Sequence, residues 1–142
     1  MIDFKNAPTE LKGRERLIES WLKNCTQNYG FNVKRVVYKF LNNEEITEAN
    51  ERFLNHGYPT DIITFNYSIK EQLEAEMLLG FEIIEAQAGE YQEGTLTEYC
   101  RVMVHGLLHC CGFNDQTKEE RAEMRKQENF CLSLRPKKLI IS

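Results

Sequence analysis

The chain has 142 residues, of which 42% are hydrophobic and 28% are charged, and this composition is ordinary for one globular domain with a buried core. No run approaches the roughly 18 consecutive apolar residues that a membrane helix needs, and the first residues lack the apolar segment of a signal peptide. We therefore expect a cytoplasmic protein, without membrane contact, in which residues 1–142 form a single domain. The net charge of −4 argues against nonspecific coating of nucleic acid but leaves room for a local basic groove.

The first half of the chain alternates between helical and strand patterns. Apolar residues at helical spacing predict a helix over about residues 10–28, and a run rich in β-branched and aromatic residues predicts a strand at 32–41. Asn42 and Glu45 have the spacing of a helix N-cap and its reciprocal partner, so a helix should follow through about residue 55. Residues 61–67 form a short β-prone run.

The second half is dominated by two long helical patterns. Residues 95–111 and 117–132 are expected to be helices, and the second begins with a capping box of Thr117 and Glu120. Before them we predict a polar helix at 68–76, a strand at 81–84 and a loop at 89–94; after them, residues 138–141 form an edge strand or a loose tail. This order predicts an α+β fold, in which a small mixed sheet packs with several helices and the helix at 95–111 is central.

The segment from His105 to Asp115 reads H-x-x-x-H-x-x-G-x-x-D and contains two of the three histidines. Residues i and i+4 lie on one face of a helix, so His105 and His109 can reach one ion. Gly112 is the residue type that ends a helix in the left-handed conformation, after which the chain can bring Asp115 back to the same point. Two imidazoles and one carboxylate, with a position left for water, are typical of catalytic zinc. The sequence thus predicts a metal-dependent hydrolase that binds one zinc ion per chain and no organic cofactor.

The angular positions on this helix separate a core face from the histidine face. At 100° per residue, one apolar stripe contains Leu96, Tyr99, Cys100, Met103, Leu107, Cys110 and Cys111. Glu98 and Arg101 project towards the histidines: Glu98 could orient an imidazole, or the two could form an i,i+3 ion pair on an exposed first turn, which is the more common arrangement. Gly106 in a helix interior indicates a close neighbour, either a packed strand or a substrate.

The motif is similar to those of two families. Metzincin peptidases share the histidine spacing but carry glutamate as general base after the first histidine, where this chain has Gly106. The bacterial YbeY-type endoribonucleases of ribosomal RNA maturation use H-G-x-L-H-L-x-G-Y-D-H, which the segment HGLLHCCGFND resembles from end to end. Residues 50–65 (NERFLNHGYPTDIITF) resemble that family's L-N-x-x-[YF]-R…P-T-D-V-L-S-F motif, and residues 79–83 (LGFEI) resemble its L-G-D-[IV].

The chain departs from the YbeY pattern at three positions. Asp115 stands where the family usually has histidine, and a carboxylate still suits zinc. Leu54 stands where the family commonly places an arginine, so either Arg52 or another cation covers that role or turnover is weaker in this protein. Phe81 replaces the usual aspartate, beside Glu82.

The resemblance implies a zinc-dependent endoribonuclease that matures the 3′ end of 16S rRNA in ribosome biogenesis, with rRNA and the ribosomal small subunit as partners. Asp61 is a candidate general base, although a hydrogen-bond acceptor at a strand edge is the more ordinary role. Phe113 and Asn114 either contact substrate or brace Asp115. The five cysteines are an odd number without paired metal spacing, so buried free thiols are expected, and Cys110 and Cys111 face the core rather than the metal. A small zinc metallopeptidase and a ribosome-assembly factor with a structural metal are the alternatives.

Overall fold

A computed structural model describes residues 1–92 and 94–140 of the chain. Its sheet has the strand order β1-β2-β4-β3. β1 pairs with β2 and β2 with β4 in parallel, whereas β3 is antiparallel to β4. The strands are β1 (Ile2–Lys5), β2 (Asn32–Leu41), β3 (Ile62–Asn66) and β4 (Gln72–Gly80). The predicted α+β class with a mixed sheet is therefore confirmed.

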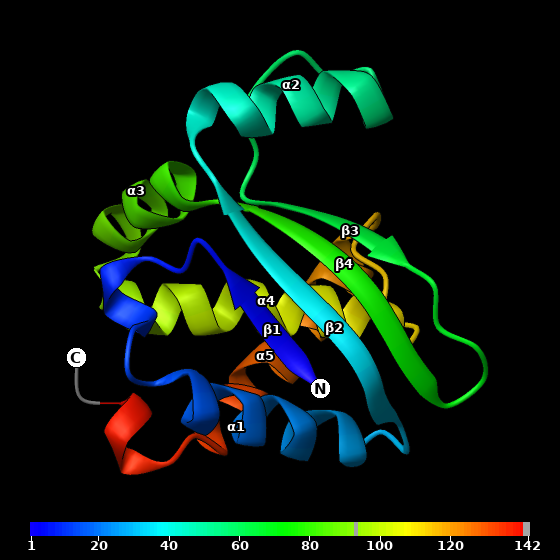
Figure 1. The fold of residues 1–142 in the computed structure, drawn as a ribbon. Coiled ribbons are helices and arrows are strands. Elements are labelled where there is room, and N and C mark those ends of the chain that lie inside the picture. Colours follow the sequence, from blue (N-terminus) through cyan, green and yellow to red (C-terminus); the bar gives the residue numbers. More distant parts are fainter. Residues whose placement is uncertain (93, 141–142) are drawn as a thin grey trace.

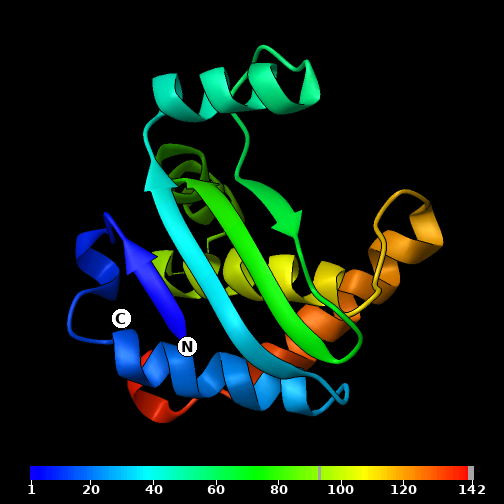
Figure 2. The same ribbon diagram turned by 45° about the vertical axis from the view of Figure 1, so that its right-hand side comes forward.

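Helices cover the two faces of the sheet unequally. Figures 1 and 2 show α1, α4 and α5 together on one face, with α4 lying next to the sheet, and α2 across the end of β2. α2 packs through Ile46 on a second, smaller cluster of Leu41, Ile63 and Leu78. The helices are α1 (Glu15–Gln27), α2 (Asn43–Leu54), α3 (Phe81–Tyr91), α4 (Thr95–Cys110) and α5 (Lys118–Ser133). Two 3-10 turns, η1 (Thr9–Leu11) and η2 (Lys137–Leu139), complete the described elements. Within the described ranges, no helix is both long and apolar enough to cross a membrane.

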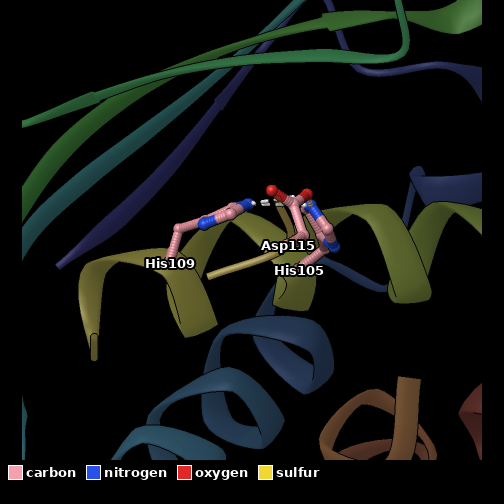
Figure 3. A group of neighbouring side chains, drawn as sticks. All are labelled: His105, His109 and Asp115. Carbon is pink, nitrogen blue, oxygen red and sulfur yellow. Dashed lines mark hydrogen bonds and ion pairs between the residues drawn. The ribbon is translucent and has the colours of Figure 1, made fainter. Parts of the chain in front are cut away.

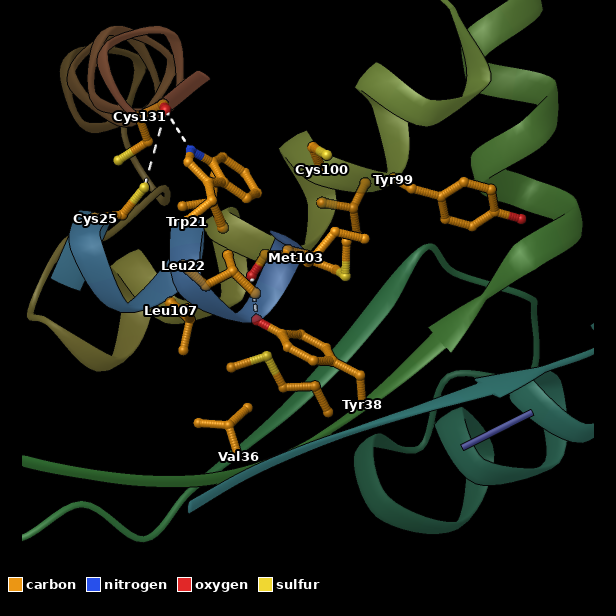
Figure 4. Packing of buried hydrophobic residues seen from close by; sticks show 14 of the residues in the cluster. Trp21, Leu22, Cys25, Val36, Tyr38, Tyr99, Cys100, Met103, Leu107 and Cys131 are labelled. Carbon is orange, nitrogen blue, oxygen red and sulfur yellow. Dashed lines mark hydrogen bonds between the residues drawn. The ribbon is translucent and has the colours of Figure 1, made fainter. Parts of the chain in front are cut away.

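The main core lies between the sheet and the three helices α1, α4 and α5 (Figure 4). Its buried polar groups are satisfied across elements, as burial requires. Trp21 Nε1 donates to the carbonyl of Cys131 at 2.8 Å, and the Tyr38 hydroxyl donates to the carbonyl of Met103 at 2.9 Å. These bonds join α1 to α5 and β2 to the central helix α4.

Several predicted elements are confirmed with their local causes. The strand at 32–41 has the predicted bounds. Asn42 and Glu45 form the capping box of α2, and Thr117 and Glu120 form that of α5, each side chain accepting from the other residue's backbone N–H. The helix predicted at 95–111 is α4. The first helix is shorter than predicted, because η1 and a left-handed Gly13 precede α1.

The helix predicted at 68–76 is wrong, since this segment turns and then enters β4. Glutamate, leucine and alanine favour helices in isolation, but the burial of β4 alternates, with Leu73, Ala75 and Met77 inside. The segment pairs on both sides, with β2 and with β3. Tertiary pairing therefore overrides the intrinsic helical preference.

The strand predicted at 81–84 is also wrong, because Phe81 begins α3 immediately after β4. α3 continues to Tyr91, so the first part of the loop predicted at 89–94 is helical as well; residue 93 lies outside the described residues. The tail forms η2 rather than a strand, and residue 141 lies outside the described residues. β1 was not predicted: it is four residues long and is defined by its pairing with β2.

Candidate metal centre

α4 presents His105 and His109 from the side of the helix opposite to its apolar stripe. All stripe residues from Leu96 to Cys110 are buried. The two imidazoles retain 22% and 30% exposure, so solvent and small groups reach them. The rings are nearly perpendicular, with an interplanar angle of 82°, and their Nε2 atoms converge at 3.0 Å. The two imidazoles therefore meet at one point, and their role as metal ligands stays a prediction.

A turn after α4 brings a carboxylate back to the histidines. Gly112 has φ of 103°, the left-handed region where glycine is unstrained, and its N–H donates to the carbonyl of His109. The N–H of Phe113 then donates to Leu108, and the Phe113 ring packs edge-on against Tyr29 at 5.3 Å. Phe113 therefore braces the turn.

The three predicted side chains meet in one triangle (Figure 3). Asp115 Oδ2 lies 3.3 Å from His105 Nε2 and 3.2 Å from His109 Nε2. Together with the 3.0 Å between the two nitrogens, these distances define three donor atoms facing one point. These three residues are the group of His, Cys, Asp and Glu side chains in the described chain whose atoms are close enough to hold one metal ion.

A fourth residue, Glu128 of α5, orients His105. Its Oε2 lies 2.7 Å from His105 Nδ1, and its side chain is 6% exposed. Burial lowers the pKa of His105, but the hydrogen bond and the charge of Glu128, with Asp115 and Asp61 adding to them, outweigh burial and raise this pKa above its ordinary value. Glu128 was not predicted from the sequence. A signal was present, because glutamate interrupts the apolar spacing of Met124, Cys131 and Leu132 on α5.

Glu98 and Arg101 form the predicted i,i+3 ion pair, with Arg101 Nε 3.9 Å from Glu98 Oε1. The predicted exposed first turn is wrong, because these residues are only 3% and 7% exposed. Arg101 Nη1 also forms an ion pair with Glu128 Oε1 at 3.2 Å and donates to Asn129 Oδ1 at 2.9 Å. A buried chain of charges therefore runs from the first turn of α4 to the carboxylate that holds His105.

A small polar cavity of about 150 Å³ adjoins His105. The charged chain forms part of its wall, and Asp61, Gln87, Val102 and Arg125 complete the lining. Asp61 shares long contacts of 3.5 Å with Gln87 Nε2 and with the hydroxyl of Thr60. The structure thus places Asp61 on the same cavity as His105, and its role as general base stays a prediction.

Gly106 faces the sheet, not the cavity. A Cβ built on it would lie 2.5 Å from Met77 Sδ and 2.9 Å from Ile62 Cδ1. Of the two close neighbours that the sequence allowed for Gly106, a packed strand or a substrate, the structure shows packed strands, β4 and β3. The position after His105 is buried, so even a longer residue there would meet the sheet.

Of the three positions that depart from the family pattern, Asp115 is part of the triangle, whereas Leu54 ends α2 and Phe81 begins α3. Arg52 stacks over Phe53 at 5.5 Å and lines a groove on α2, where Leu54 is exposed. Glu82 Oε2 accepts from the backbone N–H of Asn43 at 2.6 Å, so it serves the start of α2. Whether Arg52 takes over the arginine's role stays a prediction.

Cys110 and Cys111 belong to the core, as the helical angle predicted. Burial raises the pKa of Cys110 to about 11 and that of Cys111 to about 12. The thiolate is the form that binds metals, and these shifts disfavour it. All five cysteines are free thiols, and four of them are buried.

Comparison with known proteins identifies the family. The model of the family described as endoribonuclease YbeY matches residues 2–134. The chain belongs to this family. The YbeY endoribonuclease of Bacteroides thetaiotaomicron is 35% identical over 122 residues, covering 86% of this chain and 89% of that protein. The corresponding protein of Phocaeicola vulgatus is 34% identical over 114 residues, covering 80% and 83%.

The fold agrees with a solved structure. The solution structure of TM1509 from Thermotoga maritima matches with a TM-score of 0.67 at 24% identity, covering 94% of this chain and 88% of that one. At this identity the likeness concerns the fold alone. Family membership confirms the predicted YbeY resemblance and the predicted enzyme class, a hydrolase of the endoribonuclease type.

Proposed function

We propose that this YbeY-family protein is a zinc-dependent endoribonuclease of rRNA processing, which matures the 3′ end of 16S rRNA on the ribosomal small subunit during ribosome biogenesis. Relatives of similar length carry the description endoribonuclease YbeY, and they align over more than three quarters of both chains. The chain would meet its anionic substrate through local cations, because its net charge is −4.

The observation that carries the metal assignment is the triangle of donor atoms. A tetrahedral zinc ion with bonds of about 2.0–2.1 Å separates its ligand atoms by about 3.3 Å. The three edges between His105 Nε2, His109 Nε2 and Asp115 Oδ2 are 3.0, 3.2 and 3.3 Å. Two neutral imidazoles and one carboxylate are also a donor set that suits zinc. These three residues would hold one zinc ion and leave a coordination position open.

When bound, a zinc ion supplies Lewis acidity that activates water and polarises a phosphate oxygen. The chain's own residues would supply the remaining functions. The partly exposed imidazoles admit a phosphodiester from solvent. Arg125, with a side chain 51% exposed, stands on the cavity wall and would offset phosphate charge, while Asp61 on the same cavity is the candidate proton acceptor.

The packing of Gly106 against the sheet argues against a peptidase of the metzincin type. Such enzymes place their general base on the residue after the first histidine. Here that position is buried against Met77 and Ile62, on the sheet side of α4. A carboxylate could not stand there without displacing the sheet, which supports phosphodiester over peptide hydrolysis.

The test combines elemental analysis with cleavage of an RNA carrying an unprocessed 16S 3′ end. We expect about one zinc per chain in the wild type, and loss of both zinc and cleavage in His109→Ala and Asp115→Ala. His56→Ala is the matched control, because this third histidine is exposed on the segment after α2. Cleavage of peptides with RNA left intact would refute the proposal. Normal rRNA 3′ ends in cells that carry a folded, zinc-free His109→Ala protein would instead indicate an assembly factor.

A further inference from the structure

We infer that Glu128, clamped by Arg101, is a positioning residue that fixes His105 in the orientation and tautomer needed to bind the metal. This inference rests on the proposed metal site. Glu128 comes from α5, 23 residues beyond His105, and is not part of the histidine motif.

The two oxygens of the Glu128 carboxylate have separate partners. Oε2 lies 2.7 Å from His105 Nδ1, and Oε1 lies 3.2 Å from Arg101 Nη1. An ionised carboxylate can only accept hydrogen bonds, so Nδ1 carries the proton and donates it. The lone pair of His105 is then on Nε2, the atom that faces His109 and Asp115. One side chain thereby selects the tautomer and aims the ring.

Burial makes this arrangement rigid. Glu128 and Arg101 are 5% and 7% exposed, and a buried charge must be paired and hydrogen-bonded. Arg101 is itself held by Glu98 at 3.9 Å and by Asn129 Oδ1 at 2.9 Å. The guanidinium therefore anchors the carboxylate, and the carboxylate anchors the imidazole. Arg125 Nη1, 3.6 Å from Glu128 Oε1, adds a contact from the solvent side.

Glu128→Gln is the sharpest perturbation, because it keeps the shape and removes one acceptor. Glutamine has one accepting and one donating end, but the two groups it faces both donate. If its oxygen faces Arg101, its amide N–H₂ points at Nδ1, and the proton of His105 moves to Nε2, where it competes with the metal. If its oxygen faces His105, the N–H₂ group opposes the buried guanidinium. Neither orientation satisfies both neighbours. The tautomer of His105 with its proton on Nδ1 and its lone pair on Nε2 is therefore no longer favoured.

The experiment measures zinc affinity by competition with a chromophoric chelator, and separately the stability of the zinc-free protein in urea. We expect Glu128→Gln to bind zinc about 10- to 100-fold more weakly than the wild type, as is usual when the hydrogen-bond partner of a ligand histidine is lost. Arg101→Lys keeps Glu128 and the positive charge but not the planar guanidinium, so its loss of zinc affinity should be smaller than that of Glu128→Gln. Glu119→Gln, an exposed substitution on the same helix, is the control and should bind like the wild type.

The outcomes are separable. A purely structural role would lower the urea stability of Glu128→Gln while leaving the zinc affinity of its folded form within about twofold of the wild type; that result would overturn the inference and leave the metal site intact. An equal loss of affinity in Glu119→Gln would also overturn it. A wild-type protein that binds no zinc would remove the metal site and this inference together.

Discussion

Replacing Gly106 with alanine tests how closely α4 packs on the sheet. Alanine is better than glycine in a helix interior by about 1 kcal/mol, so an open site would gain stability. At Gly106, however, the new Cβ would lie 2.5 Å from Met77 Sδ and 2.9 Å from Ile62 Cδ1. Carbon and sulfur atoms normally approach no closer than about 3.5 Å, so the neighbours would have to move by up to about 1 Å.

The magnitude follows from these two opposing effects. Inserting a methyl group into a packed core costs about 1–3 kcal/mol. Met77 is fully buried and its sulfur lies in the middle of the side chain, so the upper part of this range applies. After the helix gain is subtracted, we expect Gly106→Ala to lower the free energy of unfolding by about 1–2 kcal/mol. For a chain of this size the melting temperature would fall by roughly 3–6 °C.

Gly89 provides a matched control within another helix. It lies near the end of α3, and a Cβ built on it would have no neighbour within 4 Å. Gly89→Ala should therefore raise the free energy of unfolding, by up to about 1 kcal/mol. Urea unfolding of the zinc-free proteins measures both variants. If Gly106→Ala were as stabilising as Gly89→Ala, the close packing of α4 on β3 and β4 would be refuted.

Three further predictions concern charge, pH and thiols. Arg125→Gln should raise the KM for RNA several-fold, while Lys126→Gln, on the same helix, should leave it unchanged; equal effects would mean that Arg125 acts only through net charge. The hydrogen bond from Lys23 lowers the pKa of Glu19, so this carboxylate stabilises the fold above about pH 4.5 and the benefit is lost as pH falls through the lowered value. Urea curves of Glu19→Gln and the wild type should thus differ slightly at pH 7 and converge as the pH falls below the lowered pKa of Glu19, and a constant difference would contradict the pKa direction. Burial raises the pKa of Cys110 to about 11, so iodoacetamide should label this thiol about 100-fold more slowly in the folded protein than a thiol of ordinary pKa. Mass spectrometry measures the labelling rate, and rapid labelling would show that the thiol is not buried.

The elements that were predicted correctly depend on short-range rules. The capping boxes of α2 and α5 and the run of β2 are set by residues within a few positions of one another. The errors have a different origin. β4 contains good helix formers and becomes a strand because β2 and β3 lie on either side of it, and β1 exists through its pairing with β2. Strand partners are distant in sequence, so local propensity does not reveal them.

The same division holds at the candidate site. The spacing of His105, His109 and Gly112 was enough to predict converging imidazoles and a reversal of the chain, since helix geometry and the left-handed turn are local properties. Glu128 was not predicted, because nothing local joins α5 to α4, and only packing brings its carboxylate to Nδ1 of His105.

The family resemblance, the two converging imidazoles and the helix that carries them follow from the sequence alone, because residues i and i+4 share one face of a helix; the return of Asp115 follows from the glycine turn after it. Tertiary structure alone decided which strands meet Gly106 and which buried charges surround His105. The physical reason is that contacts between elements depend on how whole helices and strands pack, which no short stretch of residues specifies.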